Sequence, residues 1–296
     1  MRLVLVLLAV AAPAWVASAA LAQEQSSSAP TLPVDRIGDA YEISLKSVSG
    51  SSGPNGSKGS SEDNSALVER VVGLQNDGVV LEFDLPPTTS AEDRARQWEF
   101  PVRVFKAPGR PFQLLNTPEL ASRVRSWLTS AGLSDAACGH WIFTWTAIKI
   151  ECDPQSVLQT LAPFDLRLGD LRDGAPYSEP GTLGSAPLRS LPRTGPGATF
   201  VTDLQVDPEA VRGERAEADV AVAEMMHRPQ VSLAAALQSR AAEQISGTIE
   251  VTIEVDPSGR LERRVEVEEL QIVAQSGNAT TEVTTTLVRQ PVPATN

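Results

Sequence analysis

The sequence contains few of the residues that usually carry enzyme chemistry. It has two histidines, His140 and His227, and no Gly-x-Ser-x-Gly, Ser-x-x-Lys, His-Glu-x-x-His or His-x-x-x-His pattern. The glycine-rich residues 53–58 lack the Gly-Lys-Ser/Thr ending of a phosphate-binding loop. These absences exclude the common motif-defined serine hydrolases, zinc peptidases and P-loop enzymes. We therefore predict no cofactor and no metal site.

Long apolar runs are also missing beyond the N-terminus. After residue 22 no run approaches the roughly 18 residues that a membrane helix needs, so we predict no transmembrane anchor. Arg2, the apolar residues 3–12 and the small residues 17–22 form the pattern of a cleaved signal peptide. The expected signal peptide is 1–22, cut after Ala22, and the expected location is the periplasm or the medium.

Basic residues are scarce relative to acidic ones. The chain has 25 Lys and Arg against 37 Asp and Glu, a formal net charge of −12. This balance disfavours nucleic acid and anionic membrane surfaces as partners. Only four of the basic residues are lysines. Together with the Ala- and Pro-rich background, this bias indicates a GC-rich bacterial genome.

The two cysteines, Cys138 and Cys152, are an even number in an oxidising compartment, which predicts one disulfide. Closing a loop of about 15 residues is worth about 3 kcal/mol in the chain-entropy model. Two alternatives are a free or redox-active pair and a zinc site. The zinc site would use His140 as a third ligand and lacks a fourth.

Periodicity predicts an α+β fold: a curved antiparallel β-sheet with several inserted helices. Residues 23–35 form a flexible leader, 36–290 one domain, and 174–197 a long Pro/Gly-rich loop. Strands are expected at 41–48, 67–74, 79–85, 98–105, 111–115, 198–206, 249–256 and 281–288, and helices at 117–131, 207–226 and from Ser232. A mobile loop is expected at 50–61, and a single strand buried on both faces at 140–151.

Carboxylates are plentiful and fall in pairs along the C-terminal strands. Glu250 with Glu254, and Glu266 with Glu268, occupy the polar parity of their strands, which favours a solvated face. Because the apolar parity switches nearby, we predict a β-bulge at Glu268 and Glu269. A paired-carboxylate hydrolase stays open as an alternative, since the sequence does not define which acids converge.

Tryptophans provide the main positive signal for a binding site. Trp127, Trp141 and Trp145, together with Phe143, form an aromatic group that either packs in the core or lines an apolar pocket. We take Trp127, Trp141 and Trp145 as the candidate ligand-binding residues. His140 is expected to be structural, and His227 to cap the end of a helix.

Residues 137–145 and 150–157 resemble a segment of uncharacterised secreted proteins of GC-rich bacteria. The order of strands, inserted helices and a closing hairpin at 246–249 resembles periplasmic lipoprotein-carrier folds. This second resemblance implies a curved antiparallel half-barrel around helices that holds acyl chains.

The leading hypothesis is a non-catalytic periplasmic protein that binds an apolar small molecule or an envelope protein. A carboxylate-dependent hydrolase of envelope polymers and a purely structural or assembly protein are the alternatives. The sequence carries no signal of oligomeric state.

Overall fold

A computed structural model describes residues 35–75, 77–143, 147–226, 228–229 and 231–292. The expected signal peptide 1–22 and the leader residues 23–34 lie outside these ranges, as do Trp145 and His227. Among the described residues, no helix is both long and apolar enough to cross a bilayer.

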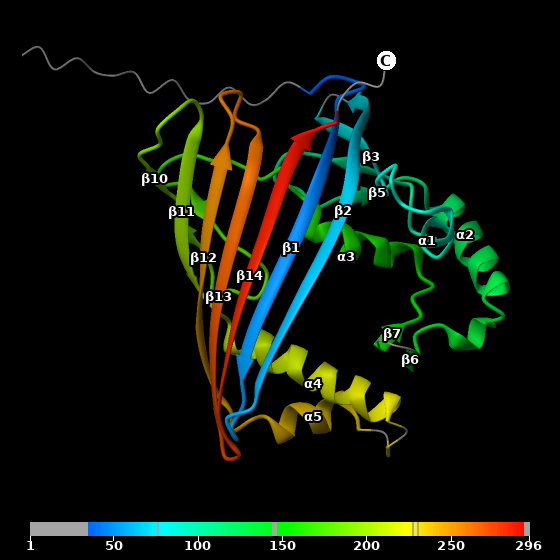
Figure 1. The fold of residues 1–296 in the computed structure, drawn as a ribbon, viewed down its shortest axis with the longest axis vertical. Coiled ribbons are helices and arrows are strands. Elements are labelled where there is room, and N and C mark those ends of the chain that lie inside the picture. The colour runs from blue at the N-terminus through cyan, green and yellow to red at the C-terminus, as the bar shows by residue number, and fades with distance from the viewer. Residues whose placement is uncertain (1–34, 76, 144–146, 227, 230, 293–296) are drawn as a thin grey trace, which may run out of the picture.

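Ten strands form one open antiparallel sheet (Figure 1). Their order across the sheet is β10-β11-β12-β13-β14-β1-β2-β3-β4-β5. In chain order, they are β1 (Ala40–Ser52), β2 (Lys58–Gln75), β3 (Gly78–Asp84), β4 (Val102–Lys106), β5 (Gln113–Leu114), β10 (Arg189–Leu191), β11 (Ala198–Gln205), β12 (Gln244–Val255), β13 (Leu261–Ala274) and β14 (Gly277–Pro291). The last strand, β14, pairs with β1 and so joins the N-terminal and C-terminal strands. The sheet does not close, because β10 and β5 stand at opposite edges.

Helices and two small ladders are inserted between the strands, which confirms an α+β arrangement. Helices α2 and α3 lie near the upper end of the sheet in Figure 1, and α4 and α5 near the lower end. The helices are α1 (Ala91–Ala95), α2 (Thr117–Ser130), α3 (Val157–Leu161), α4 (Pro208–Met225) and α5 (Leu233–Ser239), with 3-10 turns η1 (Asp135–Ala137), η2 (Pro154–Ser156) and η3 (Ala162–Phe164). The small ladders pair β6 (Trp141–Phe143) with β7 (Ala147–Lys149), and β8 (Pro176–Tyr177) with β9 (Ala186–Pro187).

One face of the sheet, called the inner face here, carries the hydrophobic core. In β12 the alternating residues Ile249, Val251, Ile253 and Val255 are buried on this face. Helix α2 packs onto the core through Leu120, Val124 and Leu128, which are spaced four residues apart and therefore share one helix face. Gly132, with φ of +68°, accommodates the turn that ends this helix.

Two segments differ from their expected form. Residues 50–61 are largely the ends of β1 and β2 with a tight turn between them. The mobile loop expected from their Ser/Gly composition is wrong, because β1 pairs with β2 continuously as far as Ser52 and Lys58. Residues 140–151 contain the two short strands β6 and β7 in place of one long strand.

The Pro/Gly-rich segment 174–197 is more structured than an exposed loop. It contains β8, β9 and β10, and Ala175, Tyr177 and Leu188 within it are buried. Backbone hydrogen bonds join residues 174 and 175 to Leu188. The segment has no sequence period, and its strands form by pairing between residues that are distant in the sequence. Local sequence patterns therefore do not predict them.

A network of buried charges lies at the upper end of the inner face. Glu69 on β2 is 1% exposed and accepts hydrogen bonds from Arg289 (2.7 Å) and Arg167 (3.0 Å). Arg167 also donates to Asp35 (2.5 Å), the residue predicted to end the flexible leader. The Arg289 guanidinium lies 3.8 Å from the centre of the Tyr41 ring. Burial lowers the pKa of Arg167, but the charges of Glu69 and Asp35 outweigh burial and raise it overall.

Candidate functional site

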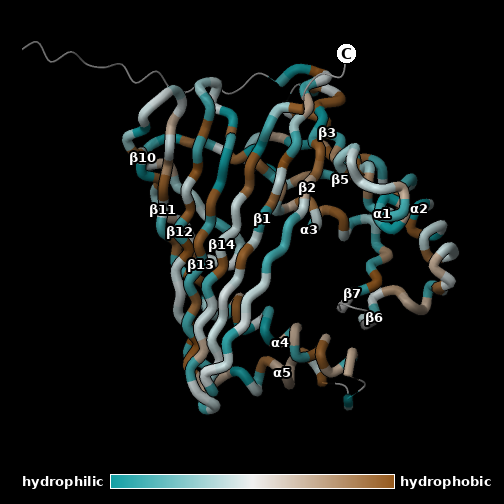
Figure 2. The backbone as a smooth tube through the Cα atoms, viewed as in Figure 1, coloured by the Kyte–Doolittle hydropathy of each residue, from teal (hydrophilic) through white to brown (hydrophobic). Residues whose placement is uncertain are grey.

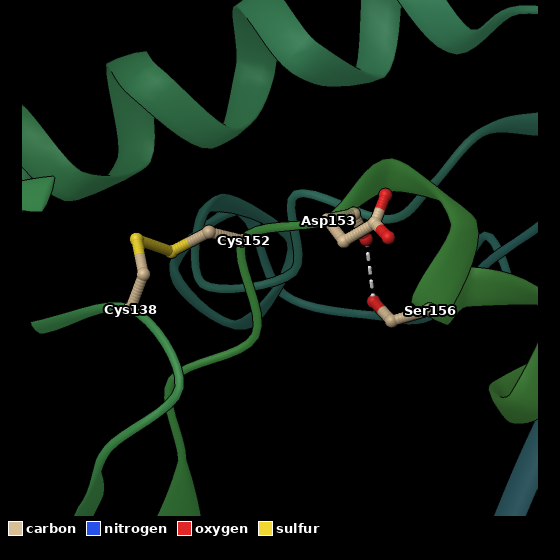
Figure 3. Close-up of a disulfide and its surroundings, with 4 residues drawn as sticks. All are labelled: Cys138, Cys152, Asp153 and Ser156. Atoms are coloured by element: carbon tan, nitrogen blue, oxygen red, sulfur yellow. Dashed lines mark hydrogen bonds between the residues drawn. A yellow bond between two sulfur atoms is a disulfide. The ribbon is translucent and has the colours of Figure 1, made fainter.

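The expected disulfide joins Cys138 to Cys152, with Cα atoms 5.5 Å apart (Figure 3). It closes the stem of the β6–β7 hairpin, where the backbone N–H of Gly139 donates to Ile150 (2.7 Å) and that of Ile150 to His140 (2.9 Å). Beyond the bridge, the Ser156 hydroxyl donates to the Asp153 carbonyl (2.7 Å) and begins η2 and α3. Because both sulfurs are bonded to each other, the zinc alternative is wrong.

The structure describes two of the three candidate tryptophans and places them on different elements. Trp127 on α2 is half-buried and packs against the main core cluster. Trp141 is half-buried at the start of β6, and Trp145 lies outside the described residues. A ligand-binding role for the three stays a prediction.

The β6–β7 hairpin meets the C-terminal part of α4. The Glu224 carboxylate lies 2.8 Å from His140 Nδ1 and accepts a hydrogen bond from the Trp141 backbone N–H (3.3 Å). The hydrogen bond with His140 is the main cause that lowers the pKa of Glu224. Through Glu224, α4 therefore fixes the position of His140 and of the Trp141 backbone.

One face of α4 packs toward α5 and forms ion pairs with the residues that follow α5. Arg215 pairs with Glu243 (3.2 Å), and Asp219 pairs with Arg240 (2.6 Å) at the C-terminal cap of α5. Val222 continues this face because it lies three residues after Asp219, and residue 226 lies four residues further. Helix α5 is opened by Ser232, whose hydroxyl accepts from the Ala235 N–H (3.2 Å).

Where α4 ends and α5 begins, four large apolar side chains are exposed. Each is between 38% and 58% exposed. We call them the apolar corner: Val222, Met226, Val231 and Leu233. Figure 2 shows apolar stretches on both helices, in contrast to the polar lower half of β1 and β2. These four residues are separated in the sequence by polar and capping residues, so no helix or strand period marks them as a group.

The carboxylates of β13 contradict their expected solvated position. Glu266 and Glu268 pair with Val251 and Ile249, which are core residues, and so lie on the inner face. The expected bulge at Glu268 and Glu269 is absent, and the register shift of this ladder lies between Glu254 and Val255. By contrast, Glu250 and Glu254 face outward as expected, opposite the buried parity of β12.

Arg264 forms ion pairs with two acidic residues, Glu266 on the inner face and Glu179. Its guanidinium donates to Glu266 (2.7 Å) and to Glu179, which also accepts from the Tyr177 hydroxyl. Burial raises the pKa of Glu266 despite Arg264. Burial, followed by the charges of Glu266 and Glu214, also raises the pKa of Glu268. Within the described part of the chain, no hydrogen bond or ion pair compensates Glu268.

Replacing Glu268 with glutamine is expected to stabilise the protein at pH 7 by about 0.5–1 kcal/mol, a value discounted for solvent screening. A carboxyl with a raised pKa in the folded state favours folding below its unfolded pKa. It loses this contribution as the pH rises through the folded pKa. Thermal unfolding of both proteins at pH 7 and pH 3.5 tests this, and the difference should vanish at the lower pH.

Glu269→Gln is the matched control, because Glu269 is exposed on the opposite face of the same strand. A Glu268→Gln protein less stable than wild type at pH 7 would contradict the prediction.

Two hollows lie at the ends of the sheet. The smaller has a volume of about 370 Å³ and is lined by Arg36, Asp39, Ser258 and Arg260. The larger has a volume of about 740 Å³ and lies at the lower end, between the ends of β11–β14 and the β1–β2 hairpin. It is lined by Gly50, Ser51, Ser52, Lys58, Gln205, Ser246, Gly247, Thr248, Glu269, Leu270, Gln271, Thr280, Thr281 and Glu282. Neither hollow is lined by a tryptophan. Among the described residues, no group of three or more His, Cys, Asp or Glu is placed to hold a metal ion.

No protein-family model matches the sequence, and no curated protein matches it. Among solved structures, the chain is similar to lipovitellin, from a study of its lipid-protein interactions. The identity is 14% and the TM-score 0.40, over 88% of this chain and 26% of the lipovitellin chain. It also matches a conserved protein of unknown function with a hot dog fold from Alicyclobacillus acidocaldarius, at 12% identity and a TM-score of 0.11, over 88% and 81% of the two chains. The chain thus spans about a quarter of the lipovitellin chain, and at these levels neither structure assigns it a function.

Proposed function

We propose that this chain is an exported, non-catalytic protein that binds a lipid surface of the cell envelope through the apolar corner. Export is inferred from residues 1–22, and the Cys138–Cys152 bridge supports an oxidising compartment. The lipid surface is a more specific form of the apolar ligand expected from the sequence.

The exposure of the apolar corner is the observation that carries this proposal. Single exposed apolar residues are normal, whereas four of them within residues 222–233, at the end of one helix and the start of the next, favour a contact with a partner or a membrane. The ion pairs of Arg215 and Asp219 already hold α5 against α4, so Val222 and Met226 are not needed to join the two helices. Their exposure therefore supports an external apolar partner.

The charges around the corner favour lipid over an acidic protein surface. Residues 225–242 contain no acidic residue, in a chain with 37 acids. Arg240 in this stretch is already paired with Asp219 and Glu243, whereas Arg228 has no ion pair among the described residues. Arg228 is exposed beside the corner, where its guanidinium suits the phosphate of a lipid headgroup. The overall negative charge directs the interaction to zwitterionic lipids, because anionic surfaces repel the rest of the molecule.

Co-sedimentation with vesicles of phosphatidylcholine and phosphatidylethanolamine tests the proposal, using the exported form of the protein. The double variant Met226→Glu with Leu233→Glu is expected to reduce the bound fraction at least about tenfold, because two charges would enter the apolar layer.

Leu191→Glu is the control, because Leu191 on β10 is as exposed as Leu233 (43%) and lies away from the corner. Circular dichroism confirms that each variant is folded. If the wild type does not sediment with vesicles, or if Leu191→Glu lowers binding as much as the corner variant, the proposal is wrong.

A carboxylate-dependent hydrolase is the second candidate, favoured by the raised pKa values of Glu266 and Glu268 on one face. The ion pairs of Arg264 with Glu179 and Glu266 count against this candidate, because a carboxylate held by an arginine is less free to take up and release a proton. The Glu268→Gln variant separates the two candidates: it should retain vesicle binding, whereas a hydrolase that uses this carboxylate would lose turnover of envelope polymers.

A further inference from the structure

Strand β2 extends well past its neighbour β3. The pairing of β2 with β3 begins at Val68, opposite Asp84, whereas its pairing with β1 begins at Lys58. Within the described part of the chain, residues 58–66 have no backbone partner on the side away from β1. We call residues 58–66 the free β2 edge; in Figure 1 they form the border of the sheet below α3.

The free β2 edge is accessible along its length. All side chains from residue 58 to residue 65 are exposed, so neither face of this part of β2 is covered. Nine residues of strand span about 30 Å. Proteins usually block such an edge with a proline, a bulge, a very short strand or charged side chains that repel a second edge. Residues 58–66 contain no proline, and the register shift of β2 lies further on, between Val71 and Gly73.

We propose that a second copy of this chain pairs antiparallel with the free β2 edge and forms a symmetric dimer. In a two-fold interface, residue i of one copy faces residue j of the other, and j faces i. A register centred on Ser60 pairs residues 58–62 of the two copies, about 17 Å of strand. It places Lys58 of each copy opposite Glu62 of the other, so the contact contains two Lys–Glu pairs. Opposite charges directly across neighbouring strands stabilise the pairing.

The existing ion pairs favour this register. Glu62 contacts Lys46 on β1 (2.8 Å), whereas Lys58 has no ion pair among the described residues. The dimer supplies Lys58 with a carboxylate and places Glu62 between two ammonium groups. A register centred on residue 61 would instead place Lys58 opposite Asn64 and form no ion pair. The charges thus select the register centred on Ser60.

Cross-linking of single cysteine variants tests the register. Ser60→Cys is expected to form a disulfide between copies under mild oxidation, because residue 60 faces itself, with Cβ atoms about 5 Å apart. Asn64→Cys is the control: in this register the two residues 64 lie about 26 Å apart along the strands. Both native cysteines are already bonded to each other and do not compete.

Charge exchange tests the ion pairs, with sedimentation velocity measured over about 1–200 µM protein. Lys58→Glu faces Glu62 with a like charge and is expected to weaken the dimer at least about tenfold. Adding Glu62→Lys to the same chain restores opposite charges and is expected to restore the dimer. Asp63→Lys is the control, since Asp63 lies on the other face and opposite Ser57.

A protein that stays monomeric throughout this range, with no Ser60→Cys cross-link, overturns the proposal. So does a double exchange that fails to recover the dimer while remaining folded. Vesicle binding by the apolar corner is measured separately and does not depend on either outcome.

Discussion

Replacing Glu69 with alanine is expected to lower the free energy of unfolding by about 3–5 kcal/mol, because it leaves buried cations without their shared counter-charge. Glu69 binds both Arg289 and Arg167, and both arginines are mostly buried themselves. Only Arg167 keeps a second carboxylate, that of Asp35. Urea unfolding at pH 7, followed by circular dichroism, measures the loss.

Asp203→Ala on β11 is the matched control. Its ion pair with Arg189 joins two side chains that are each more than half exposed, and exposed pairs contribute at most about 1 kcal/mol. The prediction is wrong if the two variants lose similar stability. Glu69→Gln should fall between wild type and alanine, because the amide oxygen still accepts a hydrogen bond without providing the charge.

Removal of the Cys138–Cys152 bridge is the second change expected to lower the free energy of unfolding strongly. The double variant Cys138→Ser with Cys152→Ser is expected to unfold about 3 kcal/mol more easily, because the open loop gains conformational entropy in the unfolded state. The bridge spans 14 positions and encloses the β6–β7 hairpin. Reduction of the wild type should lower its stability by a similar amount, measured by urea unfolding with and without reductant.

Thiol labelling of the denatured, unreduced protein provides the independent check. No label is expected on either cysteine, and two labels per chain would contradict the bridge. If the bridge is present but the serine variant is as stable as wild type, the entropic account of its contribution is wrong.

Much of the fold follows from local pattern. Strict alternation in residues 249–255 predicts a strand with one buried face, and Leu120, Val124 and Leu128 predict the buried face of a helix. The even cysteine count predicts the disulfide. These features need only the two periods of regular secondary structure and the chemistry of thiols, so neighbouring residues are sufficient to define them.

Other features depend on contacts between distant residues. Glu69 and Glu266 are acidic residues on strands, and the sequence pattern places such residues in solvent. Glu69 faces inward because Arg289 and Arg167, from another strand and a loop, provide the charges that make its burial tolerable. Glu266 pairs with Arg264 on its own strand, and this arginine is held in turn by the distant Glu179.

The two proposed contact surfaces also come from tertiary structure. Local sequence determines that residues 208–225 and 233–239 form helices, but only the packing of α4 and α5 decides that Val222 and Leu233 stay exposed. Similarly, composition makes residues 58–66 polar, and the early end of β3 makes them a free edge. A sequence defines the period and polarity of each element. Which groups are left without a partner depends on where the neighbouring elements end, and this is decided only when the whole sheet assembles.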